Sequence, residues 1–232
     1  MSTIQGVLFD KDGTLFDFRA TWEAWAASVL RRIAQGDLVQ AAALGQVIGF
    51  DFHARQFARD SIVIAGTPGE VVEVLLPHLP GQTAEQLLET LNAEAETAPQ
   101  AEVTPLGAYL SGLRALGLKL GLATNDAETP ARAHLDAAGI TELFDFISGF
   151  DSGYGAKPQP GQMLGFAAAV GLDPAQIVMV GDSRHDLVAG RAAGMACVAV
   201  LTGMADQATL APYADAVLPD ITALPAWIAA RG

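Results

Sequence analysis

Two aspartates, Asp10 and Asp12, end a short apolar run near the start of the sequence, in the stretch VLFDKDGTLFDF. Like charges repel and a carboxylate is costly to remove from water, so such a pair at the tip of a buried strand needs a compensating cation. A carboxylate can also be phosphorylated as a covalent intermediate. A second carboxylate can pass protons to a leaving group and from water. The pair therefore indicates nucleophilic and acid–base chemistry.

Polar residues follow other apolar runs in the same way. They are Thr124 and Asn125 in ATND, Lys157 in GAKPQP, and Asp182 and Asp186 in GDSRHD. In open α/β sheets, ligands bind outside the carboxyl ends of the strands, so we expect these groups at one rim with Asp10. Oxygen ligands without His or Cys favour Mg²⁺ over zinc or copper. Asp10 and Asp182 are therefore candidate Mg²⁺ ligands, with Asp186 close behind, and a lysine and a threonine would hold phosphate oxygens.

Five short apolar runs must position these groups, and they are typical of buried parallel strands. They span residues 6–10, 118–124, 144–150, 176–182 and 196–202. Helical segments that end at glycine separate the last four runs. This alternation predicts an α/β fold, a doubly wound (Rossmann-like) parallel sheet of about five strands.

The stretch between the first and second runs breaks the alternation. Residues 16–98 hold no convincing strand and about four helical stretches. One stretch has apolar residues at helical spacing from Trp22 to Ile33, and another opens with a capping box at Thr83 and Gln86. We expect a helical-bundle cap inserted after the first strand, at 16–98, and a core domain formed by 1–15 and 99–232.

The segments DKDGT, ATN, GAKPQP and GDSRHD stand in the order and spacing of the four motifs of the haloacid dehalogenase (HAD) superfamily. The chain resembles the phosphatase branch of that superfamily over about 1–15 and 100–205, and its pattern is similar to phosphoglycolate phosphatases. The resemblance implies that Asp10 is the nucleophile that becomes the aspartyl-phosphate. It implies that Asp12 is the general acid and then the base, and lends its carbonyl to Mg²⁺.

The same resemblance implies roles for the other motif residues. Thr124, with the backbone of Asn125, would bind the phosphoryl oxygens. Lys157 would steady the nucleophile and the transferring phosphate. Asp182 would ligate Mg²⁺, and Asp186 would support the ion directly or through water. The helical insert would be a cap in the C1 position, which closes over the site and selects the substrate.

Other charged residues have weaker assignments. In the cap, Arg55, Arg59 and Arg19 could reach a substrate carboxylate or a second phosphate, although such arginines are more often solvated. Strand alternation sends Lys11 to the side opposite Asp10 and Asp12, so we expect it to matter least of the three. His185 lies inside the fourth motif at a position to which the family pattern assigns no role. We interpret His134 as a histidine that is either at the surface or has its hydrogen bonds made within the protein.

The sequence predicts a Mg²⁺-dependent phosphatase that acts on a small phosphomonoester metabolite, phosphoglycolate-like or a sugar phosphate. A phosphoglucomutase-like phosphotransferase shares all four motifs and stays an alternative, as does a non-catalytic phosphometabolite-binding module. Asp12 counts against a haloacid dehalogenase, whose pattern lacks an acid at that position. A phosphonatase would need a cap lysine, and 16–98 contains none. P-type pumps have Thr in place of Asp12 and need membrane spans.

Charge and cysteine content indicate which classes of partner and which cellular compartment to expect. The net charge of −13 disfavours nucleic acid and anionic membrane surfaces. A lone cysteine, Cys197, fits a reducing cytosol. There is no signal peptide pattern, and no apolar run approaches the roughly 18 residues that a membrane span needs. We expect a soluble, cytoplasmic protein, either a monomer or a homodimer, that binds a small phosphorylated metabolite.

Overall fold

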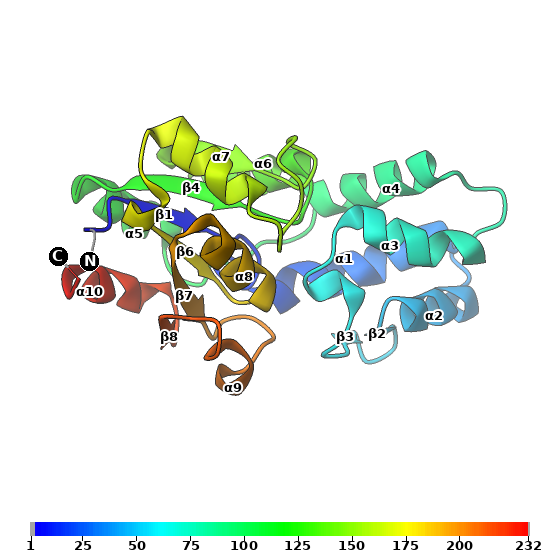
Figure 1. Ribbon diagram of the computed structural model, residues 1–232. Helices are drawn as coiled ribbons and strands as arrows, with labels where there is room; N and C mark the ends of the chain where they lie inside the picture. Colours follow the sequence, from blue (N-terminus) through cyan, green and yellow to red (C-terminus); the bar gives the residue numbers. More distant parts are fainter. Residues whose placement is uncertain (1–2, 232) are drawn as a thin grey trace.

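A parallel β-sheet forms the centre of the α/β part of the molecule (Figure 1). The computed structural model describes residues 3–231. Six strands pair in the order β5-β4-β1-β6-β7-β8, and every pairing is parallel. The strands are β1 (Gly6–Phe9), β4 (Lys119–Ala123), β5 (Phe146–Ser148), β6 (Ile177–Gly181), β7 (Ala196–Val200) and β8 (Ala216–Leu218). The predicted doubly wound α/β fold is confirmed, with one strand more than expected.

Helices cover both faces of this sheet, and the alternation of side chains along β1 divides them. Val7 and Phe9 pack in one buried cluster with residues of α5, α6 and α10. Leu8 points to the opposite face and packs in a cluster with residues of α7 and α8. These helices are α5 (Leu106–Ala115), α6 (Glu128–Ala137), α7 (Gly161–Val170), α8 (Arg184–Ala193) and α10 (Leu224–Ala229), and a short α9 spans Gln207–Leu210. Because both faces of β1 are covered, only its carboxyl end remains to carry polar groups.

Residues 16–98, between β1 and α5, form a helical extension beside the sheet, coloured from blue through cyan to blue-green in Figure 1. Its helices are α1 (Phe18–Ile33), α2 (Leu38–Val47), α3 (Pro68–Leu75) and α4 (Ala84–Glu96). They enclose a hydrophobic cluster of their own, which runs from Phe18 to Ala98. α4 begins at the capping box that the sequence predicts, with reciprocal bonds between Thr83 and Gln86. The separate cluster supports our proposed division into a cap of 16–98 and a core of 1–15 and 99–232.

The sequence pattern does not predict three short strands. β8 has three half-buried residues, and β2 (Phe50–Asp51) and β3 (Gln56–Phe57) have two each and pair antiparallel within the extension. The expectation that 16–98 holds no strand is therefore wrong. Segments this short contain too few residues to show an alternation of polar and apolar side chains.

The two segments that join the extension to the sheet run alongside each other. The N–H of Asp17 donates to Ala101 O at 2.8 Å, and the N–H of Val103 donates to Leu15 O at 3.0 Å. These bonds hold the start of α1 close to the carboxyl end of β1, which places the extension above the predicted site. Among residues 3–231, no helix is both long enough and apolar enough to cross a membrane.

Candidate active site

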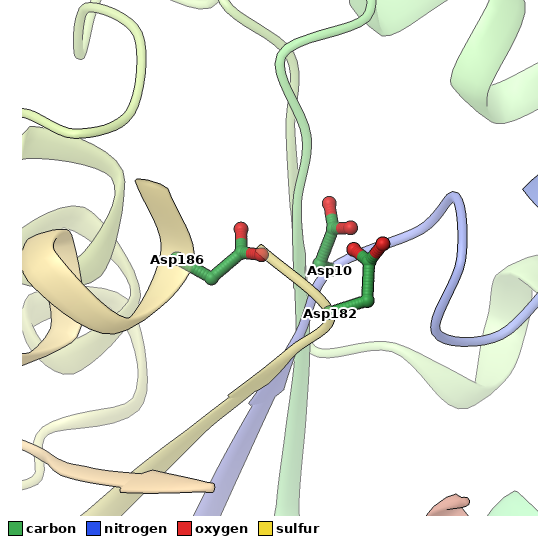
Figure 2. A group of neighbouring side chains, drawn as sticks. All are labelled: Asp10, Asp182 and Asp186. Atoms are coloured by element: carbon green, nitrogen blue, oxygen red, sulfur yellow. The ribbon is translucent and has the colours of Figure 1, made fainter. Parts of the chain in front are cut away.

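Three carboxylates meet at the carboxyl ends of β1 and β6. Asp10 directly follows β1, Asp182 follows β6, and Asp186 lies in the first turn of α8. Each offers an oxygen within 4.8 Å of the other two, and all three residues are buried. Figure 2 shows Asp10 and Asp182 next to each other, with Asp186 reaching toward them from its helix. The structure therefore brings Asp10 together with two acids, Asp182 and Asp186, that lie far from it in the sequence.

Lys157 reaches the same point from the loop after β5. Its Nζ lies 2.6 Å from Asp10 Oδ1, 2.6 Å from Asp186 Oδ1 and 2.8 Å from Ala123 O. The side chain of Lys157 is only 3% exposed. Burial would lower the pKa of Lys157, but the charges of Asp10 and Asp186 outweigh it and hold the pKa above its ordinary value. The ammonium is thus permanently charged and fixed between two carboxylates.

One ammonium does not neutralise three buried carboxylates. Burial raises the pKa of Asp10 to about 7, with Lys157 acting in the opposite direction and Asp186 and Asp12 adding to the rise. Burial and the neighbouring charges of Asp10 and Asp186 likewise raise the pKa of Asp182 well above its ordinary value. This excess of negative charge on oxygen-only donors fits a hard divalent cation such as Mg²⁺.

The two oxygens of Asp186 already have protein partners. Oδ1 accepts from Lys157 Nζ, and Oδ2 accepts from the N–H of Ser183 at 3.0 Å and from its hydroxyl at 2.7 Å. Asp10 Oδ1 also binds Lys157, and no bond of Asp10 to a donor through its second carboxylate oxygen occurs in the described chain. Asp10 therefore has an oxygen to offer a ligand, whereas Asp186 is used for support.

Two glycines make room for Asp182. A Cβ on Gly13 would lie 2.4 Å from Asp182 Oδ2, and a Cβ on Gly203 would lie 1.6 Å from the same atom. Gly13 also has a positive φ of 76°. The DG pair of DKDGT hints at Gly13, whereas nothing in the sequence around Gly203 indicates that it packs against a site residue.

Asp12 lines a cavity between the sheet and the extension. Its Oδ2 lies 3.2 Å from Lys11 Nζ. Its Oδ1 is buried and has no hydrogen-bond partner within the described part of the chain. Asp12 thus has one oxygen held by an ammonium and one oxygen without a partner, as suits a group that exchanges protons with a bound molecule.

Lys11 is fully buried and lies beside Asp12, whereas strand alternation predicts it on the opposite side. Its Nζ lies 2.9 Å from Asp126 Oδ2 and 2.8 Å from His134 Nδ1, and it stands 5.5 Å from the centre of the Trp22 ring. Strand geometry ends at Phe9, and the backbone then turns, with three N–H groups of residues 14–16 donating to the Lys11 carbonyl. Alternation along a strand therefore does not describe residues 11 and 12, and Lys11 lies beside Asp12.

His134 joins this buried group to the extension. An ammonium only donates hydrogen bonds, so His134 Nδ1 accepts from Lys11 and Nε2 carries the proton. Nε2 lies 2.7 Å from Ala95 O, in α4, and therefore donates to that carbonyl. His134 is a buried, satisfied histidine that connects the loop of Asp12 to the end of a cap helix. His134 is far from Lys11 in the sequence, so this contact could not be predicted from local sequence patterns.

Thr124 and Asn125 lie at the end of β4 and line the cavity. Thr124 Oγ accepts the N–H of Asp126 at 3.1 Å. Asn125 Oδ1 accepts the N–H of Lys157 at 2.8 Å, and Asn125 Nδ2 donates to Lys157 O at 2.9 Å. The same Nδ2 donates to Ala65 O of the extension at 2.9 Å. One side chain therefore fixes the lysine loop and also contacts the extension.

The cavity has a polar and an apolar wall. The polar wall consists of Asp10, Asp12, Thr124, Asn125, Asp126, Lys157, Asp182, Ser183, His185 and Asp186. The wall from the extension consists of Phe18, Trp22, Trp25, residues 63–68, Val71, Leu91, Asn92 and Ala95. His185, for which the sequence gives no role, is half-buried in the polar wall. The site thus lies between catalytic-type groups and a mainly hydrophobic cover.

The arginines of the extension do not reach this cavity. Arg19, Arg55 and Arg59 are exposed and are not among the residues that line it. The guanidinium of Arg59 lies 3.8 Å from the carboxylate of Asp206 at the surface. The structure thus lends no support to the expectation that Arg55 or Arg59 binds a substrate anion, which stays a prediction.

Known proteins share this architecture. A family model described as haloacid dehalogenase-like hydrolase matches residues 4–194. A phosphoglycolate phosphatase of Neisseria meningitidis serogroup A / serotype 4A is 32% identical over 225 residues, which cover 94% of this chain and 88% of that protein. A predicted phosphoglycolate phosphatase from Haemophilus somnus 129PT has a TM-score of 0.76 at 21% identity, covering 98% of this chain and 99% of the other.

A mutase is also among the structural neighbours. A putative β-phosphoglucomutase from Thermotoga maritima has a TM-score of 0.63 at 21% identity, covering 93% of this chain and 94% of the other. That likeness concerns the fold alone. The family model and the Neisseria relative both span most of the chain and agree with the four motifs. The chain therefore belongs to the haloacid dehalogenase-like hydrolase family and is a phosphatase-type enzyme of it.

Proposed function

We propose that the protein is a Mg²⁺-dependent phosphatase that hydrolyses a small phosphomonoester through an aspartyl-phosphate on Asp10. The observation that carries the proposal is the position of Asp10. It lies between the fixed ammonium of Lys157 and a group of buried acids, at the wall of a cavity that Asp12 also lines. This arrangement supports the proposal, because the proposed nucleophile, proton carrier and phosphate-binding cation all line one space.

The carboxylates of Asp10 and Asp182 and the carbonyl of Asp12 would hold Mg²⁺. The engagement of both Asp186 oxygens by Lys157 and Ser183 supports a role for Asp186 behind these ligands. When bound, the ion supplies positive charge that offsets the carboxylates and stabilises the phosphoryl oxygens. Lys157, Thr124 and the backbone of Asn125 would bind the remaining phosphoryl oxygens.

The proposed reaction has two displacements at phosphorus. The carboxylate oxygen of Asp10 that Lys157 does not bind attacks phosphorus, the bond to the ester oxygen breaks, and Asp12 gives that oxygen a proton. Water then attacks the aspartyl-phosphate, gives its proton to Asp12, and displaces Asp10 with release of inorganic phosphate. The partnerless Oδ1 of Asp12 supports its assignment to both proton transfers.

A phosphoglucomutase-like phosphotransferase is the second candidate, because a β-phosphoglucomutase is among the structural neighbours. A mutase would return the phosphoryl group of Asp10 to a second hydroxyl of a sugar, and water would attack only slowly. A non-catalytic phosphometabolite-binding module is disfavoured, because the nucleophile, the proton carrier and the lysine are all present and meet at one cavity.

Phosphate release from a panel of phosphomonoesters, measured with MgCl₂ and with EDTA, tests the proposal. We expect Mg²⁺-dependent release by the wild type and none by Asp10→Asn, whose melting temperature should stay close to that of the wild type. Isomerisation of hexose 1-phosphates without phosphate release would instead support the mutase. Turnover retained by Asp10→Asn would refute the assignment of the nucleophile.

A further inference from the structure

The wall of the cavity that faces the catalytic aspartates is apolar. The extension contributes the rings of Phe18, Trp22 and Trp25 and the side chains of Val71 and Leu91. The indole N–H of Trp25 is used within the protein, because it donates to Leu91 O at 3.1 Å. In the described chain, the extension brings no Lys or Arg to the cavity. The part of a substrate that projects from the phosphate therefore meets mainly carbon.

Residues 63–68, which we call the roof loop, cover the cavity without offering a backbone N–H to a ligand. Each N–H of residues 63–67 already has an acceptor within the loop or next to it, and Pro68 has no N–H. The bonds are Val63 to Ser61 Oγ at 3.2 Å, Ile64 to Ser61 O at 3.2 Å, Ala65 to Ile62 O, Gly66 to Ile62 O at 2.9 Å, and Thr67 to Glu70 Oε2 at 2.7 Å.

The roof loop also has an anion behind it. The carboxylate of Glu70 accepts from both the N–H and the hydroxyl of Thr67, the latter at 3.0 Å. A second negative charge on a substrate would lose its water at the roof loop without gaining a backbone donor or a cation from that loop. The polar wall has two basic side chains, Lys157 and His185. Lys157 is held by Asp10 and Asp186. His185 lies between Asp182 and Asp186 in the sequence.

One polar side chain of the extension is available to a ligand. Asn92, in α4, lines the cavity, and its Oδ1 is buried without a hydrogen-bond partner in residues 3–231. An unpaired buried acceptor is costly, so a donor on the substrate would be favoured there. The space beside these walls is also small, because the centres of water-sized groups have about 60 Å³ in this partly open cavity.

We infer that the substrate is a phosphate ester of a small, uncharged and largely apolar alcohol that presents one hydrogen-bond donor to Asn92. This inference rests on the proposed phosphatase function. It distinguishes this chain from enzymes for phosphoglycolate, whose leaving group carries a carboxylate. It also disfavours sugar phosphates, whose many hydroxyls would have to lose water against the aromatic rings of Trp22 and Trp25.

A matched pair of esters tests the charge of the leaving group. Phosphoglycolate and 2-hydroxyethyl phosphate differ in having a carboxylate or a hydroxymethyl group at the same position. We expect kcat/KM with Mg²⁺ to be about tenfold or more higher for 2-hydroxyethyl phosphate. Equal or better hydrolysis of phosphoglycolate, or of glucose 6-phosphate, would overturn the inference.

Substitutions at Asn92 test the wall directly. Asn92→Lys places a cation in the cavity and should raise the ratio of kcat/KM for phosphoglycolate over 2-hydroxyethyl phosphate by about tenfold. Ala93→Lys adds the same charge at the next, exposed position of α4 and should leave that ratio unchanged. Asn92→Leu should remove any preference for 2-hydroxyethyl phosphate over propyl phosphate. If the ratios stay constant in all three variants, each folded as judged by its melting temperature, the inference fails.

Binding of inert phosphonates separates this inference from the proposed function. Propylphosphonate and phosphonoacetate carry an ethyl group or a carboxylate on the same phosphonomethyl group, and neither has a phosphate ester bond to hydrolyse. Calorimetric titration in the presence of Mg²⁺ should give propylphosphonate the lower Kd by about tenfold. If no ester releases phosphate, not even p-nitrophenyl phosphate, the proposed function fails, while the phosphonate pair still decides the inference. Tighter binding of phosphonoacetate would refute the apolar site.

Discussion

The ammonium of Lys11 and the carboxylate of Asp126 form a fully buried ion pair, with 2.9 Å between Nζ and Oδ2. The same ammonium lies 3.2 Å from Asp12 Oδ2. Asp12 is therefore held through one oxygen, and its other oxygen is left for the cavity. Lys11 does not line the cavity, so in the proposed mechanism it would act through Asp12 as a positioning residue.

Replacing Lys11 should affect substrates according to their leaving groups. In Lys11→Met, Asp12 loses the cation that orients it, so proton donation to the leaving oxygen should suffer. An alkyl phosphate needs that proton, whereas the nitrophenolate of p-nitrophenyl phosphate leaves without it. We expect kcat to fall at least about tenfold more for propyl phosphate than for p-nitrophenyl phosphate. Steady-state kinetics with both esters measures the difference.

The control for this variant is Lys119→Met, which removes a half-exposed lysine that pairs with Asp145 at the surface. It should change neither rate. Lys11→Met also leaves the buried carboxylate of Asp126 without its cation, so we expect a lower melting temperature as well. Equal losses for the two esters would show that Lys11 serves only the fold.

His134 should make the protein less stable in mild acid. Burial and the charge of Lys11 lower the pKa of His134 below its ordinary value of 6.5, against the opposing effect of Asp12 and Asp126. The unfolded chain then binds this proton more readily than the folded chain, so the free energy of unfolding falls as the pH drops below about 6.5. Above that pH the contribution is fully present.

Urea unfolding at several pH values between about 7 and 5 measures this effect. The decline in the free energy of unfolding should be shallower in His134→Gln than in the wild type. His53→Gln, at an exposed site of the extension, should follow the wild-type slope. Identical slopes for the wild type and His134→Gln would contradict the buried, neutral state of this histidine.

Gly203 should be needed for metal binding although it carries no side chain. In Gly203→Ala, the new methyl group would occupy the position of the Asp182 carboxylate, 1.6 Å from its Oδ2. We expect the Mg²⁺ concentration for half-maximal activity to rise about tenfold or more, with a smaller Mg²⁺-induced increase in melting temperature. Gly107→Ala is the matched control, because a Cβ at Gly107 meets no atom within 4 Å. Unchanged Mg²⁺ dependence in Gly203→Ala would refute the contact.

Cys197 should be unreactive in the folded protein. Burial raises the pKa of its thiol to about 11, and its Sγ donates to Leu187 O at 3.3 Å. At pH 8 only about one thiol in a thousand is then ionised, and the thiolate is the reactive form. Labelling with Ellman's reagent should be slow in buffer and rapid in concentrated urea. Rapid labelling of the native protein would contradict this burial.

The sequence is informative about the sheet and the motifs because both depend on neighbouring residues. β1 and β6 are continuous apolar runs, and β4 is apolar after Lys119. The polar group that follows each run falls at the same rim by the geometry of parallel strands. The meeting of Asp10, Asp182 and Asp186 therefore follows from local patterns and one rule of topology.

The cover of the site could not be predicted in this way. The pair of Lys11 and His134 joins residues 123 positions apart, and its geometry depends on the turn after β1 and on the packing of α6 against α4. The arginines of the extension show the same limit, because their charge suggested a place in the site, whereas they are exposed and do not line the cavity. Which side chains of a helical insert face the core depends on how it docks, and periodicity within the insert does not reveal this.

The roof loop has a consequence for how this enzyme could diverge. Among the described residues, the backbone N–H groups of the loop bond within residues 61–70, and the bond from Asn125 to Ala65 O links the loop to the catalytic half. Side chains in the loop and on α4 can therefore be exchanged without disturbing Asp10, Asp12 or Lys157. Natural selection, or a laboratory library of variants in the loop and on α4, could therefore change which alcohol the enzyme accepts one substitution at a time. The groups that carry out phosphoryl transfer would stay the same.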